Sequence, residues 1–405
     1  MAIAASGAVS LQDFRTEFVG GSAAISLGDL YRGGSNIRAK AGNNTATNLA
    51  ASVPTSGVID FNDFYGTAKG FRKTYTSGAT NQDASSIFGD DYGVDYPKEI
   101  VINSGVELGA TSTSQEALQI DSGLSGTMTI TNNGTLSGAG GSAGGGTGGD
   151  AFEANAPCTL INNGTIRAGG GGGGNGGAGG SGGTGGQGRT SYQGYGSWTS
   201  FQASGTYGNG TGHWMFEIDG SRIWYWNGSV VGGNDGSVTI GTNPQYQRET
   251  SYSYSQYFSQ FPTWARRYKM RRRSYQTFYN YHSGGAGGAG GSGGSGGVGQ
   301  GYNQSAGSGS GGSSGSGGSA GGTNAGSGGT GGTGGSGGAG GGFGNSGSSG
   351  NTGSTGNSGG NGNYTNGSGG SGGSSGSGGG AAGKYIRGLS NVTFTNNGTV
   401  QGGTA

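Results

Sequence analysis

Glycine recurs in this chain as long tracts in which every third residue is not glycine. In the tract from Gly169 to Gly188, the later interruptions are Asn175, Ala178, Ser181, Thr184 and Gln187. The same spacing returns from Ser283 to Val298 and from Ser327 to Ala339. A polyproline-II-type helix has three residues per turn, so this pattern places every side chain on one edge and leaves two edges bare. Bare edges let neighbouring helices exchange backbone hydrogen bonds and Cα–H···O contacts, which predicts packed polyglycine-II helices.

A flexible linker is the alternative interpretation of these tracts. Glycine loses more backbone entropy on ordering than any other residue, and chains rich in Gly and Ser usually stay disordered. Repeat slippage in the gene would also give a period of three. The strict phase, the similar lengths of the tracts and the strand units that flank them favour packing. An ordered tract of about 20 residues would span roughly 60 Å and serve as a strut.

Short strand units bracket the tracts in the stretches "TITNNGTLSGAGG", "TLINNGTIRAGG" and "TFTNNGTVQGG". Each unit reads as a brief apolar strand, a bend, a second strand, an Asn-Gly turn and then glycines. Such a unit cannot bury its apolar side alone, so the units should stack on one another as solenoid repeats do. The turns expected to adopt the positive φ of a tight turn are Asn133-Gly134, Asn163-Gly164 and Asn397-Gly398. Comparison of the three copies extends the repeat backwards to an earlier apolar strand. The corresponding residues are Leu118 and Ile120 in the first copy, Phe152 and Ala154 in the second, and Tyr385 and Ile386 in the third.

The first 70 residues contain an internal repeat, "AVSLQDF", "AISLGDLY" and "VIDFNDFY". The pairs with the spacing of a capping box are Ser10 with Asp13, Ser26 with Asp29, and Asp60 with Asp63. Each copy therefore predicts a short extended segment that enters a short helix. The region is either a small stable module or a docking and oligomerisation module. Residues 71–97 read as a loop, in which Asp90, Asp91 and Asp95 favour a solvated acidic surface over a calcium site, because the spacing is not that of an EF-hand.

Composition excludes several classes of protein. Apolar residues make up 29% of the chain, too few for a single large hydrophobic core, and 5 prolines against 109 glycines exclude collagen. The net charge of +1 points to no particular partner, and the lone Cys158 allows no intrachain disulfide. The N-terminus lacks the features of a signal peptide, and no apolar run reaches the ~20 residues that span a bilayer. We expect no cofactor, no metal site, no nucleic-acid partner and no membrane insertion.

Residues 189–282 differ from the rest of the chain, because they hold all five tryptophans and an excess of basic residues. The run "HWMFEIDGSRIWYW" predicts a hairpin. The segment is a β-module with an aromatic core, a nucleic-acid-binding segment, or a recognition surface of the kind that Tyr, Trp and Arg build. We favour recognition, and the candidate contact residues are Trp214, Trp224, Tyr225, Trp226, Tyr252, Tyr254, Tyr257, Phe258, Trp264, Arg266, Arg267 and Tyr268. The single aromatics between tracts, Tyr302, Phe343 and Tyr364, are further candidates.

Strand-NNGT units that open into period-three glycine tracts, with aromatic-rich segments between them, resemble the glycine-rich tail-fibre adhesins of tailed bacteriophages, above all the tip adhesins of T-even-type phages. The resemblance implies a sandwich of polyglycine-II helices whose joining loops touch the host surface. It also implies a place in the virion tail, a host receptor such as a porin or lipopolysaccharide, and attachment to other tail proteins through the N-terminal module. A homotrimer would fit N-terminal repeats that bury little alone, and a monomeric cap is the alternative.

Two other functions compete with adhesion. A depolymerase needs two carboxylates across a sugar, and the aromatic segment offers only Glu217, Asp219, Asp235 and Glu249. The only histidines are His213 and His282, so we expect no enzyme. A structural glycine-rich matrix protein would have no need of the aromatic and basic insertion.

The expected fold is mainly β and polyglycine-II, with a small N-terminal module, short β-solenoid-like strand units, packed polyglycine-II helices and an inserted aromatic-rich β module. Its expected domains are the N-terminal module 1–70, stacked strand units 71–168, a glycine tract 169–188, the aromatic and basic insertion 189–282, glycine tracts 283–382, and a C-terminal strand unit 383–405.

Overall fold

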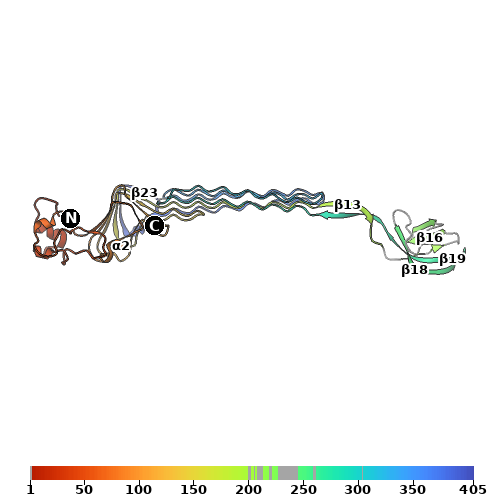
Figure 1. Ribbon diagram of the computed structural model, residues 1–405, viewed down its shortest axis with the longest axis horizontal. Helices are drawn as coiled ribbons and strands as arrows, with labels where there is room; N and C mark the ends of the chain where they lie inside the picture. Colours follow the sequence, from red (N-terminus) through yellow and green to blue (C-terminus); the bar gives the residue numbers. More distant parts are fainter. Residues whose placement is uncertain are drawn as a thin grey trace.

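The computed structural model describes residues 2–198, 274–302 and 304–405, together with the backbone of the strands from β14 (Gln202–Ser204) to β19 (Phe261–Arg273). The structure is mainly β with few helices. The N-terminal region, a stack of strands, a bundle of glycine tracts, a two-stranded ribbon and the strands β14–β19 follow one another along a thin, elongated molecule (Figure 1). The C-terminus lies beside the stack, where the glycine bundle begins (Figure 1).

The helices are all short. Their bounds are α1 Leu11–Phe14, η1 Arg15–Val19, η2 Leu27–Leu30, η3 Phe61–Phe64, α2 Ala84–Phe88, η4 Gly89–Asp91 and η5 Leu389–Asn391. No helix among the residues that the structure describes combines the length and apolar character needed to cross a bilayer.

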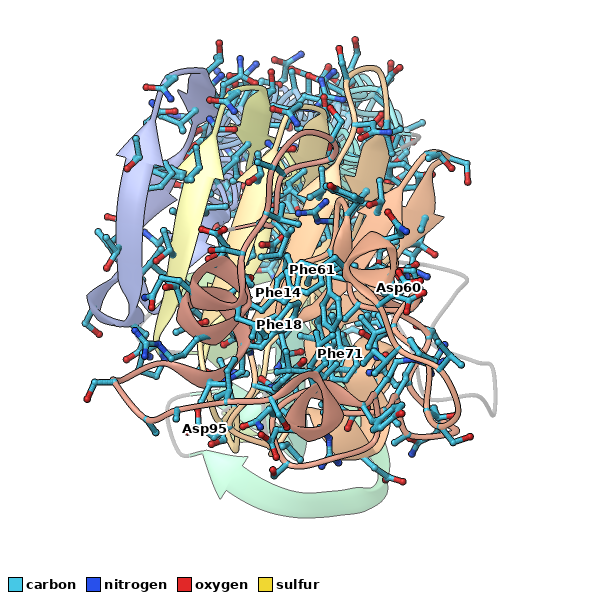
Figure 2. All side chains as sticks on the ribbon, turned by 90° about the vertical axis from the view of Figure 1, so that its left-hand side faces the viewer. Phe14, Phe18, Asp60, Phe61, Phe71 and Asp95 are labelled. Atoms are coloured by element: carbon cyan, nitrogen blue, oxygen red, sulfur yellow. The ribbon has the colours of Figure 1, made fainter. Side chains whose placement is uncertain are left out.

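Three capping boxes shape the N-terminal region, as predicted. In each, a carboxylate accepts the backbone N–H three residues before it: Asp13 from Ser10 at 2.7 Å, Asp29 from Ser26 at 2.8 Å, and Asp63 from Asp60 at 2.9 Å. The helices that follow bury Phe14, Leu30 and Phe64 completely. The rings of Phe14 and Phe64 stack with centroids 4.2 Å apart, and Phe61 lies against Phe14 (Figure 2). The region has a hydrophobic core of its own, so the expectation that these repeats bury little alone is wrong.

Five successive rungs of short strands form the stack, and each rung gives one strand to each of three sheets. The first sheet contains β1 (Thr47–Asn48), β2 (Phe71–Tyr75), β5 (Lys98–Ile102), β8 (Met128–Asn132), β11 (Cys158–Asn162) and β22 (Val392–Asn396). The second contains β3 (Ala79–Thr80), β6 (Glu107–Gly109), β9 (Thr135–Ser137), β12 (Thr165–Arg167) and β23 (Thr399–Gln401). The third contains β4 (Gln82–Asp83), β7 (Leu118–Ile120), β10 (Phe152–Ala154), β21 (Lys384–Arg387) and β24 (Gly403–Thr404). Pairing is parallel throughout, except that β1 runs antiparallel to β2.

Alternating apolar residues of the strands fill the interior of the stack. In the first sheet Ile100, Ile130 and Leu160 lie in register, and all three are fully buried. In the third sheet Phe152 pairs with Leu118 on one side and with Ile386 on the other. A fully buried side chain of this size stabilises a fold by about 1.5–3 kcal/mol, so stacking supplies the core that one rung lacks. The pairing of Ile386 with Phe152 places the third copy of the repeat one residue later than its sequence suggested.

Residues 71–97 form the first rung and its cap, so the prediction of a loop is wrong. The strands β2, β3 and β4 pair with the rung that follows them, and Phe71 is fully buried. The side chain of Asp83 then starts α2 by accepting the backbone N–H of Ser85 at 2.7 Å. This rung has no NNGT motif, and two of its strands are only two residues long. Pairing with the next rung, rather than local pattern, makes it a strand unit.

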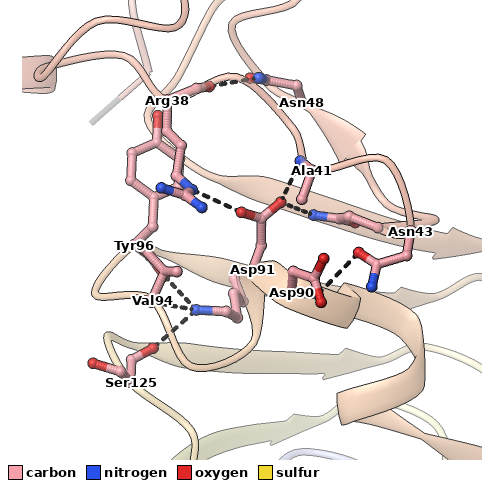
Figure 3. A network of polar contacts seen from close by, with 11 residues as sticks. Arg38, Ala41, Asn43, Asn48, Asp90, Asp91, Val94, Tyr96 and Ser125 are labelled. Atoms are coloured by element: carbon pink, nitrogen blue, oxygen red, sulfur yellow. Dashed lines mark hydrogen bonds and ion pairs between the residues drawn. The ribbon is translucent and has the colours of Figure 1, made fainter.

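Asp91 also departs from the expected solvated loop, because it is fully buried at the junction between the N-terminal region and the stack (Figure 3). Its carboxylate accepts hydrogen bonds from Arg38 Nε at 2.7 Å, the Ala41 N–H at 2.8 Å and Asn44 Nδ2 at 2.9 Å. Burial alone would raise the pKa of Asp91, but these three donors outweigh it and hold that pKa below its ordinary value. Asp90 and Asp95 are exposed, as predicted.

Lys98, at the start of β5, is buried beside the same junction. Its Nζ donates to the backbone carbonyls of Val94 at 2.8 Å, Tyr96 at 3.0 Å and Ser125 at 2.8 Å. Burial lowers the pKa of Lys98 to about 8, against the opposing attraction of Asp91 and Asp95. The ammonium group therefore satisfies two carbonyls of the loop before β5 and one carbonyl of the loop before β8.

Asparagine ladders run along the stack at its NNGT turns. Nδ2 of Asn132 donates to Oδ1 of Asn162 at 2.8 Å, and Nδ2 of Asn162 donates to Oδ1 of Asn396 at 2.7 Å. A second, exposed ladder joins Asn133, Asn163 and Asn397. Ladders of this kind form when identical residues stack in register, so the repeated motif fixes the alignment of the rungs.

The glycines of these turns do not have the positive φ expected of them. They are needed because neighbouring rungs lie backbone on backbone. A Cβ on Gly164 would lie 2.0 Å from the carbonyl oxygen of Gly134, and one on Gly398 would lie 2.0 Å from that of Gly164. Close approach, rather than a left-handed conformation, therefore explains the NNGT motif.

The glycine arm is an insertion at one corner of the stack. The connections from the second sheet to the third, rung by rung, are Asn81, 110–117, 138–151, 168–383 and Gly402. In the fourth rung the chain leaves after β12 and returns at β21, so both ends of the arm are held by paired strands.

Six tracts in the described part of the arm run out and back between the stack and the ribbon: 169–187, 283–300, 305–321, 325–342, 345–362 and 366–383. The first of these, the central tract, donates backbone hydrogen bonds from Gly179 to Gly291 and from Gly180 to Ser354. It also accepts one at Gly180 from Gly332. The same pattern repeats every three residues along the tract, so the glycine segments are bonded to one another rather than free as linkers.

Serine hydroxyls complete this network on the edge that carries side chains. The N–H of Ala178 donates to Oγ of Ser374 at 2.8 Å, and the N–H of Ser181 donates to Oγ of Ser371 at 2.7 Å. Elsewhere in the bundle the N–H of Ala289 donates to Oγ of Ser316 at 2.8 Å. The interrupting serines therefore satisfy amides that have no glycine carbonyl facing them.

Candidate functional site

The arm places a two-stranded ribbon between the glycine bundle and the far end of the molecule (Figure 1). The ribbon consists of β13 (Gly188–Tyr195) and β20 (Tyr275–His282), which pair antiparallel from Gly188 with His282 to Tyr195 with Tyr275. Beyond it lie β14, β15 (Thr206–Tyr207), β16 (His213–Ile218), β17 (Ser221–Trp226), β18 (Gln245–Phe258) and β19.

The contact residues proposed from sequence all fall on these far strands, and we call them the tip residues. They are Trp214 on β16; Trp224, Tyr225 and Trp226 on β17; Tyr252, Tyr254, Tyr257 and Phe258 on β18; and Trp264, Arg266, Arg267 and Tyr268 on β19. Backbone pairing sets Trp214 opposite Tyr225, and Tyr254 opposite Arg267. The predicted hairpin is confirmed by the antiparallel pairing of β16 with β17. The side chains of the tip residues lie outside the described part of the structure.

The three single aromatics between tracts lie at opposite ends of the bundle. Tyr302 packs against the backbone of Gly109 in the stack, and the ring of Phe343 lies 3.9 Å from the guanidinium carbon of Arg167. Both lie at the end that joins the stack and both are half-buried, so the expectation that they are exposed is wrong, whereas their role as receptor contacts stays a prediction. Tyr364 lies at the ribbon end, 46% exposed.

Exposed tyrosines gather on one face of the ribbon, where sequence reasoning had singled out only the neighbouring Tyr364. Side chains two residues apart on a strand point to the same face, so Tyr279 and Tyr281 lie on one face of the ribbon. Tyr279 is 45% exposed and Tyr281 is 56% exposed. The ring of Tyr281 contacts that of Tyr364, with centroids 4.9 Å apart. The guanidinium carbon of Arg189 lies 4.7 Å from the ring centroid of Tyr279 and 5.2 Å from that of Tyr364. We call Arg189, Tyr279, Tyr281 and Tyr364 the ribbon surface.

The signal for this surface was present in the sequence as alternation. In "YQTFYNYH" tyrosines recur at even spacings, and neither ribbon strand contains an acidic residue. What the sequence did not show is that Tyr364, 83 positions after Tyr281, is brought back beside it by the turn between two tracts. The opposite face of the ribbon carries Tyr192 stacked on Phe278, with centroids 5.5 Å apart.

Ionisable side chains concentrate at the other end of the arm. Arg387 forms ion pairs with Asp150 at 2.6 Å, Glu153 at 3.3 Å and Glu116 at 3.7 Å, beside a cavity of about 350 Å³. Burial, followed by the charge of Glu153, raises the pKa of Glu116. This network ties β21 to the stack where the arm returns.

Two further groups in the stack have perturbed pKa values. Burial raises the pKa of the Cys158 thiol to about 12, so this cysteine is an apolar core residue. Burial, and then a hydrogen bond with Asp83, raises the pKa of Asp121 to about 6. Within the described residues no group of three His, Cys, Asp or Glu side chains is placed to hold a metal ion.

One comparison with known proteins identifies a family for this chain. The model of the phage tail fibre adhesin Gp38 family matches residues 71–308, which run from the first rung of the stack through the ribbon to the start of the third glycine tract of the arm. No curated protein and no solved structure matched the chain. Because the family model covers more than half of the 405 residues, this protein belongs to the phage tail fibre adhesin Gp38 family and binds a receptor on the host cell.

Proposed function

We propose that the tip residues make the receptor contact and that the rest of the chain positions them. The observation that carries this proposal is the arm, which leaves the stack after β12, returns at β21 and holds the strands β14–β19 at the end farthest from the N-terminal region. Aromatic and arginine side chains form most high-energy contacts in protein recognition. An outer-membrane porin or a lipopolysaccharide glycan is the class of receptor that such a surface fits.

In this proposal the glycine tracts are polyglycine-II helices that act as a rigid strut. The hydrogen bonds that recur every third residue support it, because three residues per turn is the period of that helix. The stack is the β-solenoid-like base from which the strut extends. Residues 71–168 and 383–405 together form this base, residues 169–188 and 283–382 the strut, and residues 189–282 the recognition module.

The N-terminal module, residues 1–70, would attach the adhesin to the other proteins of the virion tail. It lies at the end of the molecule opposite the tip (Figure 1). Its own core, around Phe14 and Phe64, supports a module that folds as a unit. The homotrimer expected from the sequence stays a prediction. The N-terminal core removes one argument for it, which was that these repeats bury little surface alone. Light scattering of the purified protein would decide between a trimer and a monomeric cap.

We also propose that the adhesin binds its receptor without catalysing a reaction. The described carboxylates nearest a cavity belong to the Arg387 network, where ion pairing and packing against the base of the arm occupy them. They lie at the base of the arm, away from the end that would face the host.

Binding to intact bacteria tests the proposed contact. The full chain, labelled with a fluorophore, is screened against a panel of bacteria until a strain that binds it is found. We expect Trp224→Ala and the double variant Arg266→Ala, Arg267→Ala to bind that strain at least about tenfold more weakly. Arg72→Ala, which removes an exposed arginine of the stack, is the matched control and should bind normally. Normal binding by the tip variants, with their folding intact, would show that the contact lies elsewhere.

A further inference from the structure

The ribbon surface has a feature that tip contact does not explain. Its rings are about half exposed although they lie between the tip and the bundle, and Arg189 stacks on two of them. Neither β13 nor β20 carries an acidic residue, so the surface is positively charged. We propose that Arg189, Tyr279, Tyr281 and Tyr364 form a second binding surface, for an acidic polysaccharide chain of the host envelope. This inference rests on the proposed function and adds a ligand class and a location.

The shape of the surface fits a linear ligand. Tyr279 and Tyr281 are two residues apart on one face, so their rings follow one another along the strand. The same face continues to Tyr275, 43% exposed and about 20 Å from Tyr281 along β20. A tyrosine ring offers an apolar face with a hydroxyl at its rim, which suits the C–H face and the hydroxyls of a sugar. A row of such rings accommodates successive sugars of an extended chain.

The charge selects an acidic chain. The guanidinium of Arg189 lies over two aromatic rings, and a guanidinium matches a phosphate or a carboxylate bidentately through its N–H groups. The rings of Tyr279 and Tyr364 fix the position of Arg189 before any ligand arrives, which lowers the entropic cost of binding. A protein receptor would more commonly require an apolar pocket for a buried anchor, and this surface is an open strip.

The other face of the ribbon supplies a matched control. Tyr192 is 51% exposed, lies on the same two strands and stacks on Phe278, but points to the opposite side. Tyr192→Ala therefore changes the ribbon as much as Tyr281→Ala does, without touching the proposed surface. Arg189→Lys keeps the positive charge but loses the planar guanidinium, which can make two parallel hydrogen bonds to a phosphate. This variant therefore separates specific phosphate recognition from general electrostatic attraction between the surface and the ligand.

The test uses the full chain and lipopolysaccharide purified from the strain that it binds in the whole-cell assay. Binding is measured with native lipopolysaccharide, with the same material after chemical removal of phosphate, and with neutral dextran. We expect the double variant Arg189→Ala, Tyr281→Ala to bind native lipopolysaccharide about tenfold more weakly, Arg189→Lys to fall between, and Tyr192→Ala to match wild type. Removal of phosphate should weaken wild-type binding by a similar factor, and dextran should not bind.

Two results would overturn the inference. One is equal binding of native lipopolysaccharide by wild type and by the double variant, when thermal denaturation curves show that both proteins are folded. The other is wild-type binding to envelope proteins freed of lipopolysaccharide that the double variant loses, which would make the ribbon surface a protein contact. Whole-cell binding that persists in either case leaves the proposed function standing, whereas failure of the full chain to bind any strain would count against the proposed function itself.

Discussion

The stack and the glycine bundle solve the same packing problem in opposite ways. In the stack, alternating side chains such as Ile130 and Leu160 fill the space between sheets, and the strands pair through their backbones. In the bundle almost nothing is left to fill, because the tracts approach until backbone meets backbone. Both arrangements satisfy the buried N–H and C=O groups, which is the general requirement for an ordered interior. The comparison teaches that a fold can replace a hydrophobic core with a hydrogen-bonded lattice when side chains are absent.

The two regions share one device, the glycine that permits close approach. The stack needs it in the three rungs that carry the NNGT motif, as at Gly164, where a Cβ would lie 2.0 Å from the carbonyl oxygen of Gly134. The central tract of the bundle needs it at two of every three positions, as at Gly179, where a Cβ would lie 2.1 Å from the carbonyl oxygen of Gly332. The bundle should therefore be destabilised most by substitutions that add a methyl group. The stack should be destabilised most by substitutions that remove a polar or apolar side chain.

The largest effect is expected from Gly179→Ala in the central tract. The added methyl would push away the neighbouring tract and break hydrogen bonds on both sides, at a cost of about 3 kcal/mol or more. Hydrogen exchange measured by mass spectrometry should show protection lost along the tracts while peptides of the stack stay protected. Gly369→Ala is the control, because a Cβ there meets nothing within 4 Å. Equal protection in the two variants would mean that the tracts are not tightly packed.

The second effect, in the stack, is expected from Asn162→Ala. This residue is fully buried and joins the ladder on both sides, so its loss removes the hydrogen bonds that it makes with the side chains of Asn132 and Asn396. The amide of Asn132 then keeps only the carbonyl of Thr165 as a partner, and the carbonyl oxygen of Asn396 keeps only the N–H of Gly398. We expect the free energy of unfolding to fall by about 2–3 kcal/mol in thermal or denaturant melts. Asn163→Ala, in the exposed ladder, should cost well under about 1 kcal/mol, since water replaces the lost contacts. A reversed order would show that the inner ladder does not hold the rungs.

A smaller effect in the bundle is expected from Ser374→Ala. Its hydroxyl accepts the N–H of Ala178 at 2.8 Å, and the neighbouring Ser375 is exposed. Loss of this hydrogen bond should cost about 0.5–1 kcal/mol and speed amide exchange at Ala178. Ser375→Ala should leave that exchange rate unchanged. Equal behaviour of the two variants would remove the serine hydroxyls from the lattice and leave only glycine backbone in it.

The smallest effect is a pH dependence that belongs to the stack alone, since neither 169–188 nor 283–383 contains an acidic or basic residue. The folded pKa of Asp121 is raised to about 6, so its contribution to stability is present below its unfolded pKa of about 3.8 and is lost as pH rises through 6. Asp121→Asn removes this loss and should stabilise the protein at pH 7 by a few tenths of a kcal/mol, with little change at pH 4. Melting curves at both pH values would check it, and an equal shift at both would contradict the assignment.

Several elements were predictable from sequence because their causes are local. The capping boxes at Ser10, Ser26 and Asp60 depend on residues three positions apart, and all three form. The hairpin of β16 and β17 and the order of the strand units also followed from short patterns. Other elements depend on distant partners. Residues 71–97 become a rung only beside the next one, and Asp91 is buried only because Arg38 and Asn44 cover it.

The candidate site divides in the same way. The tip residues were selected from composition, and their backbone positions on β16–β19 agree with a β-module at the far end. Tyr302 and Phe343 lie at the stack end, which was not predictable because sequence does not say which turn of an out-and-back bundle faces the stack. The contact of Tyr364 with Tyr281 was missed because four tracts separate the two residues along the chain.

Three features of this adhesin follow from its amino-acid sequence: a period of three that leaves bare glycine edges, repeated NNGT units, and an aromatic, basic insertion between tracts. Local periodicity and composition specify these features, so they can be predicted directly. The emergence of the whole arm from one corner of one rung, and the carbonyl that each glycine faces, became visible in the three-dimensional fold. Those outcomes depend on hydrogen bonds between residues such as Asn162 and Asn396, 234 positions apart, and no local pattern carries that information.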